Sequence, residues 1–223
     1  AGNLLDPDVP IDEAAVRRAA AAIDERAGRL SKVVGNLLDL SRIEAGAIVP
    51  DLALHDLDEL VETALRDLPP AAAHRIEVAL PADLPPVLAD GLFVDEALVN
   101  VLDNAIRYAG AAARLRIRAE GSVPGRVDLI VEDDGPGLAE TDRERIFDKF
   151  YRPERRSLTP EAPGMGIGLS VVRGLLEAMG GTARAERSEL GGLAIRLGLP
   201  EGRTREIVQP PTPPEPRTPS AVR

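Results

Sequence analysis

The chain of 223 residues has no cysteine and very few aromatic side chains. The lack of cysteine excludes disulfides, thiolate metal sites and cysteine nucleophiles. Aromatic residues make up only 2%, so the core has to be built from Ala, Leu, Val and Ile, and there is no aromatic platform on which bases could stack. The two histidines are too few to build a zinc site.

Charge and hydropathy argue against two further classes of partner. The 27 basic and 37 acidic side chains give a net charge of −10, which argues against nucleic acid bound through its phosphate backbone. Any bound phosphate must therefore be held locally. No run approaches the roughly 18 apolar residues of a membrane span, so we expect no membrane contact from these residues.

One long helix is predicted for residues 11–48. Apolar residues repeat there every seven positions, at Val16, Ile23, Leu30 and Leu37. Asp12 is the expected N-cap, and Gly46 before Pro50 is the expected stop. Residues 2–6 resemble the last turn of a preceding helix. A helix this long cannot bury its apolar stripe alone, so we expect dimerisation through a four-helix bundle. The alternative is a helix packed on its own domain.

Residues 50–200 mix helical and strand patterns. Apolar residues at helical spacing predict helices at residues 57–68, 95–109 and 166–179. Alternating apolar residues predict a strand at 75–79, a hairpin with strands at 115–119 and 127–131, and a last strand at 193–199. The expected fold class is α+β, a two-layer sandwich with three helices on one face of a mixed, mainly antiparallel sheet.

Residues 201–223 differ in composition from the rest of the chain. They contain six of the prolines, at Pro210, Pro211, Pro213, Pro214, Pro216 and Pro219, and almost no apolar side chains. We expect a disordered tail, with a ligand for proline-binding domains as the alternative.

The helix predicted at residues 95–109 carries a polar face beside its apolar stripe. Asn100, Asn104, Arg107 and Tyr108 fall at positions i, i+4, i+7 and i+8. Asparagine is a mediocre helix former, so two of them one turn apart are costly unless their side chains hold something. An amide oxygen suits Mg²⁺, and an arginine one turn further on suits a phosphate. The alternative interpretation is a solvated helix face.

Asp133 stands at the end of the second hairpin strand, directly before a turn that contains Gly135 and Gly137. A carboxylate buried there can accept a hydrogen bond from an exocyclic amine such as N6 of adenine. The glycines allow the backbone to approach a ligand closely. Asp-Gly turns are common, so this pattern alone does not distinguish a binding site from an ordinary turn.

A glycine-rich segment opens the third predicted helix, with the sequence Gly164-Met165-Gly166-Ile167-Gly168-Leu169. Free N–H groups at a helix N-terminus favour an anion such as phosphate. The segment is not the dinucleotide fingerprint, because no strand directly precedes it, and a P-loop is excluded because Gly-Lys-Ser/Thr does not occur.

A long polar connection, residues 139–163, joins these last two motifs. Loops of this length in a compact domain are usually functional or mobile. Lys149 and Arg152 lie beside aromatic residues and are placed to fold over a phosphate. The alternative is a surface excursion with a hydrophobic plug.

Together, the order and spacing of these motifs resemble the N, G1, F and G2 boxes of bacterial sensor histidine kinases. The matching sequences are Asn100-x3-Asn104-x2-Arg107-Tyr108, Asp133-x-Gly135-x-Gly137, Phe147-x2-Phe150 and Gly164-x-Gly166-x-Gly168-Leu169. Residues 29–46 resemble the second helix of that family's dimerisation and phosphotransfer hairpin. With residues 84–90 and 177–182, they are most similar to the potassium and osmotic-stress sensors of the Kdp type.

The resemblance implies an ATP-binding sandwich of the Bergerat (GHKL) type, with ATP and Mg²⁺ as ligands. Asn104 would hold Mg²⁺ with Asn100 close by, and Arg107 would meet phosphate. Tyr108 would pack on the purine, and Asp133 would accept from adenine N6. The lid, residues 138–163, would close over the triphosphate. The implied ATP-binding set is Asn100, Asn104, Arg107, Tyr108, Asp133, Gly135, Gly137, Lys149, Arg152, Gly164, Met165, Gly166, Ile167, Gly168 and Leu169.

The resemblance also divides the chain into three parts. Residues 1–49 would be a partial dimerisation and histidine-phosphotransfer hairpin whose first helix is truncated, residues 50–200 the ATP-binding catalytic domain, and residues 201–223 the tail. The full-length protein would form a homodimer through the bundle and pass its phosphoryl group to a response regulator. It would be a membrane-anchored sensor of which this cytoplasmic portion makes no membrane contact.

Asn100 favours phosphoryl transfer over hydrolysis. In the related ATPases of the gyrase, MutL and Hsp90 type the equivalent residue is a Glu that activates water, whereas an amide cannot take a proton near neutral pH. The expected function is therefore transfer of the ATP γ-phosphoryl group to a histidine. The alternatives are an ATP-driven conformational clamp and a scaffold that only dimerises.

The phosphoacceptor of the family lies in a His-Asp/Glu-Leu-Arg-Thr-Pro run, and this chain is expected to begin after it. His55-Asp56-Leu57 matches only the first three residues of that run, and His74 is expected in a loop. We therefore expect the catalytic portion of a protein-histidine kinase that binds Mg-ATP but does not phosphorylate itself.

Overall fold

The computed structural model describes residues 13–66, 68, 73, 75–110, 112–153 and 165–202, without the side chains of residues 25, 29 and 122. Several sequence predictions lie outside these residues. They are the helical turn at residues 2–6, Asp12, His74, Gly164, the second part of the lid and the tail from residue 203 onwards.

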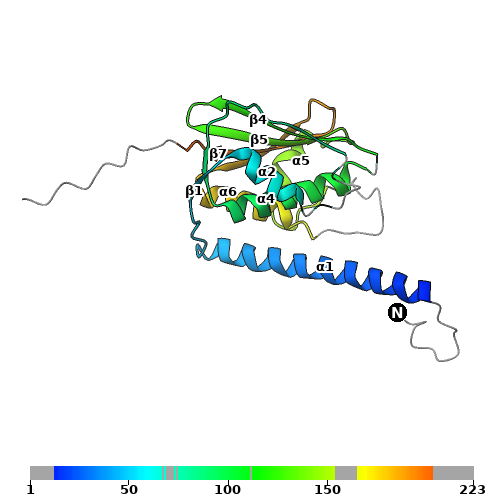
Figure 1. Ribbon diagram of the computed structural model, residues 1–223. Coiled ribbons are helices and arrows are strands. Elements are labelled where there is room, and N and C mark those ends of the chain that lie inside the picture. The colour runs from blue at the N-terminus through cyan, green and yellow to red at the C-terminus, as the bar shows by residue number, and fades with distance from the viewer. Residues whose placement is uncertain are drawn as a thin grey trace, which may run out of the picture.

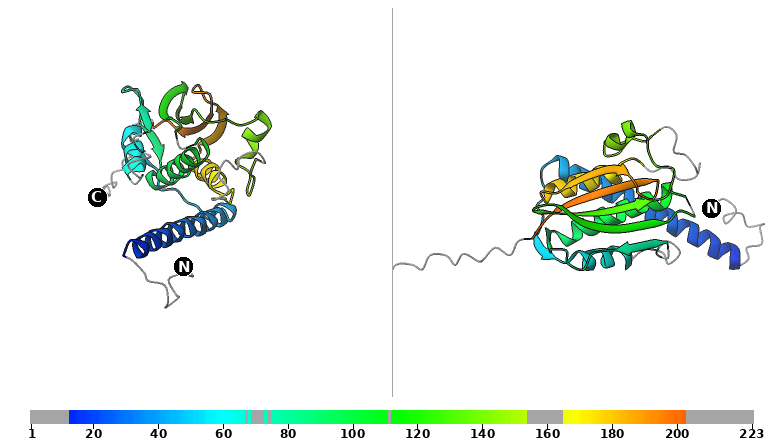
Figure 2. Two further views of the ribbon diagram at one scale, coloured as in Figure 1. Left: turned by 90° about the vertical axis from the view of Figure 1, so that its right-hand side faces the viewer. Right: turned by 90° about the horizontal axis from the view of Figure 1, so that it is seen from above.

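A sheet and a layer of helices form the domain, and one further helix lies against the helical layer (Figure 1). In chain order the elements are α1 (Glu13–Glu44), β1 (Ala53–His55), α2 (Leu57–Arg66), β2 (Ile76–Ala79), β3 (Val87–Ala89), α4 (Gly91–Tyr108), β4 (Leu115–Val123), β5 (Arg126–Asp133), α5 (Glu140–Arg145), α6 (Gly168–Ala178), β6 (Thr182–Arg187) and β7 (Leu193–Pro200). Figure 2 shows α4 and α6 between the sheet and α1.

The main sheet has five strands in the order β2-β4-β5-β7-β6. Strands β2 and β4 pair in parallel, and the other three pairs are antiparallel. Strands β1 and β3 form a separate antiparallel pair. The predicted α+β sandwich with a mixed, mainly antiparallel sheet is therefore confirmed.

The core lies between the sheet and the helical layer. Successive side chains of a strand point to opposite faces, and Val127, Leu129 and Val131 on one face of β5 are all buried in the main core cluster. The buried stripe of α4 consists of Val94, Ala97, Leu98, Val101 and Leu102. Phe147 is the one aromatic side chain among the buried core residues that the structure describes. The aliphatic core expected from the composition is present.

The opposite face of the sheet carries a network of charged side chains around Glu132, whose side chain is fully buried. Glu132 Oε1 accepts hydrogen bonds from Nε of Arg116 at 2.8 Å and Nε of Arg118 at 3.0 Å. Its other oxygen accepts from Oγ of Ser188 at 3.1 Å and from N of Glu189 at 3.2 Å. Burial alone would raise the pKa of Glu132, but these hydrogen bonds outweigh it and lower the pKa.

The long helix α1 packs on α6 near its C-terminal end. Leu40 of α1 forms a small buried cluster with Ile167, Val171 and Leu175, and Ile43 packs against this cluster. The seam predicted for a bundle is otherwise exposed, at Val16, Ile23, Leu30, Val34 and Leu37. After the helix, the backbone N–H of Gly46 bonds to O of Ile43, so the predicted stop is observed. The helix ends at Glu44 rather than near Ile48.

Several boundaries and four elements differ from the sequence prediction. Helix α4 begins four residues earlier than predicted, because Oδ1 of Asp90 caps it by accepting from N of Leu92 at 3.0 Å and N of Phe93 at 3.3 Å. Helix α6 begins at Gly168 instead of Gly166. Strands β1, β3 and β6 and the short helix α5 were not predicted, because β1 and β3 have only three residues each and neither β6 nor α5 carries a clear apolar period. Among the described residues, no helix is long and apolar enough to cross a membrane.

Candidate functional site

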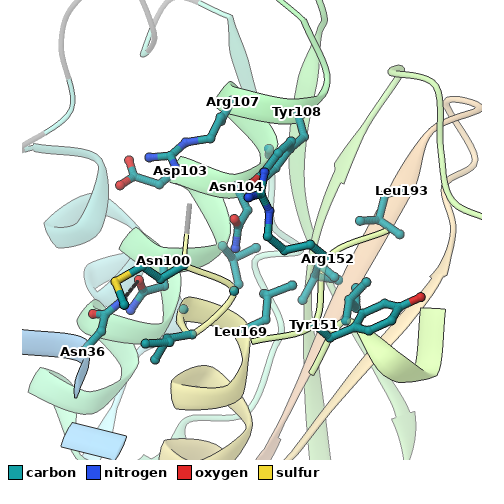
Figure 3. Close-up of a pocket in the computed structure, with 18 of the residues that line it drawn as sticks. Asn36, Asn100, Asp103, Asn104, Arg107, Tyr108, Tyr151, Arg152, Leu169 and Leu193 are labelled. Carbon is teal, nitrogen blue, oxygen red and sulfur yellow. Dashed lines mark hydrogen bonds between the residues drawn. The ribbon is translucent and has the colours of Figure 1, made fainter. Parts of the chain in front are cut away.

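A cavity of about 670 Å³ opens where α4, the end of β5, the start of α6 and α1 meet. Most of the predicted nucleotide-binding residues line it: Asn100, Asn104, Arg107, Tyr108, Asp133, Arg152, Met165, Gly166, Ile167, Gly168 and Leu169. Figure 3 shows Asn100 on one side of the cavity and Leu193 on the other, with Asn104 and Tyr108 between them. A volume of this size is typical of small-molecule sites.

Asp133 is buried at the end of β5, with only 3% of its surface exposed. Its Oδ1 accepts hydrogen bonds from N of Gly135 at 2.8 Å and from N of Leu193 at 3.2 Å. The backbone of Gly192 passes so close that a Cβ added there would lie 2.1 Å from the same oxygen. The carboxylate is therefore held by the backbone at the wall of the cavity, where an uncharged hydrogen-bond donor can meet it.

Gly135 and Gly137 do not line the cavity, although both were predicted to bind the nucleotide. A Cβ at Gly135 would lie 2.6 Å from Cα of Ala109, so this glycine lets the strand end pass the C-terminus of α4. A Cβ at Gly137 would lie 3.2 Å from O of Gly192. In this structure both glycines shape the turn that carries Asp133 and do not face the cavity.

The two asparagines of α4 lie one turn apart along the cavity. Asn100 is 4% exposed, and its Nδ2 donates to O of Glu96 at 3.0 Å. Its Oδ1 accepts from Nδ2 of Asn36 in α1 at 3.3 Å. In Figure 3 the side chain of Arg152 reaches towards Asn104 and Tyr108. Amide oxygens, an aromatic ring and a guanidinium thus meet in one space.

The glycine-rich segment forms a wall of the cavity beside Asn100, at the N-terminus of α6. Gly166 has φ +71°, and a Cβ there would lie 2.8 Å from O of Tyr151, so only glycine fits. A Cβ at Gly168 would lie 3.2 Å from Oδ1 of Asn100. The helix start and the first asparagine are therefore in close contact, and the N–H groups of the first turn of α6, which have no partner within the helix, suit an anion in the cavity beside them.

Lys149 and Arg152 were both predicted to contact a phosphate from the lid, but Lys149 does not line the cavity. It forms an ion pair with Glu44 at the end of α1, whereas Arg152 does line the cavity. Tyr151, which directly precedes Arg152 in the sequence, donates from its hydroxyl to Oδ1 of Asp142 at 2.7 Å. The guanidinium of Arg145 stacks on its ring at 4.2 Å. These contacts fix the base of the lid beside the cavity.

Sequence analysis missed the contribution of α1 to the cavity. Gly28, Lys32, Val33 and Asn36 all line it. Lys32 forms an ion pair with Asp103 of α4. The available signal was the pair Lys32-x3-Asn36, two polar residues one turn apart, but α1 carries many other polar residues, and the element that it faces could not be known from the sequence.

Comparison with known families decides the assignment. Residues 89–203 match the family described as histidine kinase-, DNA gyrase B-, and HSP90-like ATPase, which is more than half of the chain. The chain belongs to this ATPase family. The matched range contains α4, Asp133 and the glycine-rich segment, the elements that surround the cavity.

Relatives of this ATPase family member are sensor kinases. It is 34% identical over 206 residues to the sensor protein KdpD of Escherichia coli, covering 92% of this chain and 22% of that protein. It is 36% identical over 210 residues to the KdpD of Mycobacterium tuberculosis, covering 90% of this chain and 24% of that protein. The crystal structure of full-length ShkA in complex with AMPPNP matches 87% of this chain and 41% of that one, with a TM-score of 0.67 and 29% identity. The catalytic region is therefore that of a sensor histidine kinase, and the chain spans about a quarter of the KdpD proteins.

In this kinase region, α1 and α4 meet through three polar contacts that run antiparallel along both helices. Lys32 pairs with Asp103, Asn36 with Asn100, and Asp39 with Glu96. Burial raises the pKa of Glu96 to about 7, and the charge of Asp39 and a hydrogen bond with it act in the same direction. Lys32 lowers this pKa and Asp95 raises it, while Arg42 pairs with Asp39 at 3.5 Å. The contact of α1 with the ATPase domain thus includes a carboxyl group, Glu96, whose pKa is raised to about 7.

Replacement of Glu96 by Gln is expected to remove a pH dependence from the docking of α1. The docked state holds the proton with a pKa near 7, against an ordinary value of 4.5, so docking is favoured at low pH and weakens as the pH rises through about 7. Amide exchange of α1, corrected for the intrinsic rate at each pH, should show less protection at pH 8 than at pH 5.5 in the wild type. E96Q should show equal protection at both. E62Q, at an exposed site of α2, is the control, and a pH dependence unchanged in E96Q would contradict the assignment.

The cavity contains side-chain oxygens of a type that Mg²⁺ accepts as ligands. Asn104 and Asn100 offer amide oxygens beside the N-terminus of α6, and Mg²⁺ binds few protein oxygens because it keeps several waters and phosphate oxygens. Among the described residues, no cluster of three or more acidic or histidine side chains could hold a metal by itself. Two amide oxygens are a small donor set, so a metal held here would take its other ligands from water and from a bound phosphate.

Proposed function

We propose that this chain binds Mg-ATP in the cavity and transfers the γ-phosphoryl group to a histidine of a sensor kinase bundle, for relay to a response regulator. The observation that carries the proposal is that residue 100, in the wall of the cavity, has an amide side chain and not a carboxylate. Of the described residues that line the cavity, only Asp103 and Asp133 are acids, and both are engaged, one by Lys32 and one by backbone N–H groups. A site without a free base favours phosphoryl transfer to a side chain over activation of water.

The residues define how the nucleotide lies. Asp133 accepts a hydrogen bond from N6 of adenine, and Tyr108 packs on the purine ring. The phosphates then extend along α4 towards Asn104 and Asn100, where they face the N-terminus of α6. Arg107 and Arg152 hold phosphate oxygens from the two sides of this path. When bound at Asn104, Mg²⁺ supplies positive charge that offsets the negative charge of the phosphates.

The chemistry requires little of the chain beyond placement. A neutral nitrogen of the acceptor imidazole attacks the γ-phosphorus, the new N–P bond forms, and the bond from the γ-phosphorus to the β,γ-bridging oxygen breaks to release ADP. Hydrogen bonds from the amide and guanidinium groups keep the γ-phosphoryl in line with the acceptor and exclude water from it.

Neither histidine of the chain is the proposed acceptor. His55 lies in β1, its ring is 3.3 Å from where a Cβ on Gly91 would stand, and it does not line the cavity. His74 lies outside the described residues. The acceptor would be a histidine on the first helix of a bundle formed with a second copy of the kinase. We propose that the reaction takes place in the cytoplasm, because that is where ATP and response regulators are found.

Transfer in trans tests the proposal. The chain is mixed with radiolabelled ATP, Mg²⁺ and a separate protein that carries the bundle hairpin of a Kdp-type kinase with its acceptor histidine. We expect acid-labile, alkali-stable label on the hairpin protein and none on the chain. A hairpin without its histidine is the control and should stay unlabelled. Label on the chain itself would overturn the assignment of the acceptor, and steady phosphate release without label would favour the conformational clamp.

A further inference from the structure

We propose that α1 is part of the nucleotide site and that Lys32 binds the terminal phosphate of ATP. The inference rests on the function proposed above, because it requires a triphosphate in the cavity. It adds one residue from outside the region matched by the ATPase family, residues 89–203, to the residues that contact the nucleotide.

The position of Lys32 within the cavity is the first argument. Lys32 and Asn36 line the cavity beside Asn100 and Asp103. Asp133 is held at the other end, next to Leu193. Figure 3 shows Asn36 and Asn100 together on one side and Leu193 on the opposite side. If adenine lies at Asp133, the phosphate furthest from the base lies at the α1 end.

The charge balance is the second argument. The cations that line the described part of the cavity are Lys32, Arg107 and Arg152. Of the three, only Lys32 comes from α1. An ATP molecule brings one more negative charge than ADP, and that charge lies on the γ-phosphate. A cation at the far end of the cavity offsets it directly.

The ion pair with Asp103 places the ammonium group without using all of its donors. An ammonium group carries three N–H donors, so it can bond to the Asp103 carboxylate and a phosphate oxygen at the same time. The carboxylate also limits the freedom of a flexible side chain, which reduces the entropy that phosphate binding has to overcome. The side chains of Lys32 and Asp103 are 34% and 40% exposed, as expected at the rim of a binding site.

The packing of α1 on α6 holds Lys32 in position. A Cβ added at Gly174 would lie 2.6 Å from Cδ1 of Ile43, so the two helices are in close contact at this point. Leu40 is buried in the same interface, two turns after Lys32. Lys32 therefore reaches the cavity from a helix that is packed against α6 and against Ile167 of the glycine-rich segment.

A comparison of the affinities for ADP and AMPPNP, each with Mg²⁺, distinguishes a contact of Lys32 with the γ-phosphate from a purely structural ion pair. Isothermal titration of K32Q should give an AMPPNP affinity about tenfold below the wild type, the size expected for one charge-assisted hydrogen bond, with the ADP affinity within twofold. K32R keeps the charge and should retain most of the AMPPNP affinity. R17Q removes an exposed, acid-paired cation of the same helix and should change neither affinity. Equal losses for both nucleotides, or no loss, in K32Q would overturn the inference.

Chemical modification gives an independent readout that needs no substitution. The chain has only two lysines, Lys32 and Lys149, on well-separated stretches of sequence, so acetylation of each can be quantified by mass spectrometry. AMPPNP should slow the acetylation of Lys32 more than ADP does at equal saturation. Equal protection by the two nucleotides would contradict a γ-phosphate contact. A wild-type chain that binds neither nucleotide would instead refute the proposed function itself.

Discussion

Replacement of Asp133 by Asn should weaken the binding of both ADP and AMPPNP by roughly 10- to 150-fold, because a hydrogen bond that involves a charged group is worth about 1.5–3 kcal/mol. The substituted amide can still accept from the backbone N–H groups of Gly135 and Leu193 through its oxygen. Its nitrogen, however, is a donor and would face the N6 donor of adenine. Titration calorimetry measures the effect, and the thermal unfolding temperature should change little.

Asp134 offers the matched control, since it is the next residue and also an aspartate. Its carboxylate accepts from N and Nε of Arg114, at 2.8 and 3.0 Å, and does not line the cavity. D134N should bind ADP like the wild type. If D133N and D134N bound ADP equally well, Asp133 would not be the adenine acceptor and the proposed orientation of the nucleotide would be wrong.

Replacement of Glu132 by Ala should lower the free energy of unfolding by about 3 kcal/mol, because it leaves Arg116 and Arg118 without their shared buried partner. We choose the lower end of the usual range for a broken buried ion pair, since both arginines are about one-fifth exposed and keep other acidic partners. For a domain of this size, the unfolding temperature should fall by roughly 6–12 °C. Calorimetry or circular dichroism measures the change.

Glu189→Ala is the control for this network. Glu189 pairs with the same Arg116 at 2.7 Å, but its side chain is 66% exposed. An exposed ion pair contributes less than about 1 kcal/mol, so E189A should unfold within a few degrees of the wild type. Equal destabilisation by E132A and E189A would show that burial of Glu132 is not what makes its contacts stabilising.

Much of the fold could be predicted because its elements carry regular apolar periods. The stripe of α4 and the alternation of β5 are clear in the sequence, and both elements were predicted. Strand β6 was missed because it lies at the edge of the sheet, where none of its six residues, Thr182–Arg187, is fully buried. It therefore lacks the run of large apolar residues that marks a central strand. Helix α5 was missed because its six residues contain no buried side chain at all.

The candidate site was predictable where a motif and its geometry coincide. Asn100, Asn104 and Tyr108 share one face of a helix, and that face lines the cavity. Lys149 shows the limit of such reasoning. Its charge and its place in the lid suggested a phosphate contact, but here its side chain pairs with Glu44, more than a hundred residues earlier in the chain.

The sequence by itself determined which residues form the amide-bearing helix face, the acid at the strand end and the glycine-rich helix start, because helix and strand periods and glycine geometry are local properties. Only the tertiary structure decided that α1 closes the far end of the cavity with Lys32 and Asn36, and that Glu96 meets Asp39. Those contacts join residues more than fifty positions apart. They depend on how α1 docks on α4 and α6, and no local pattern in the sequence encodes that docking.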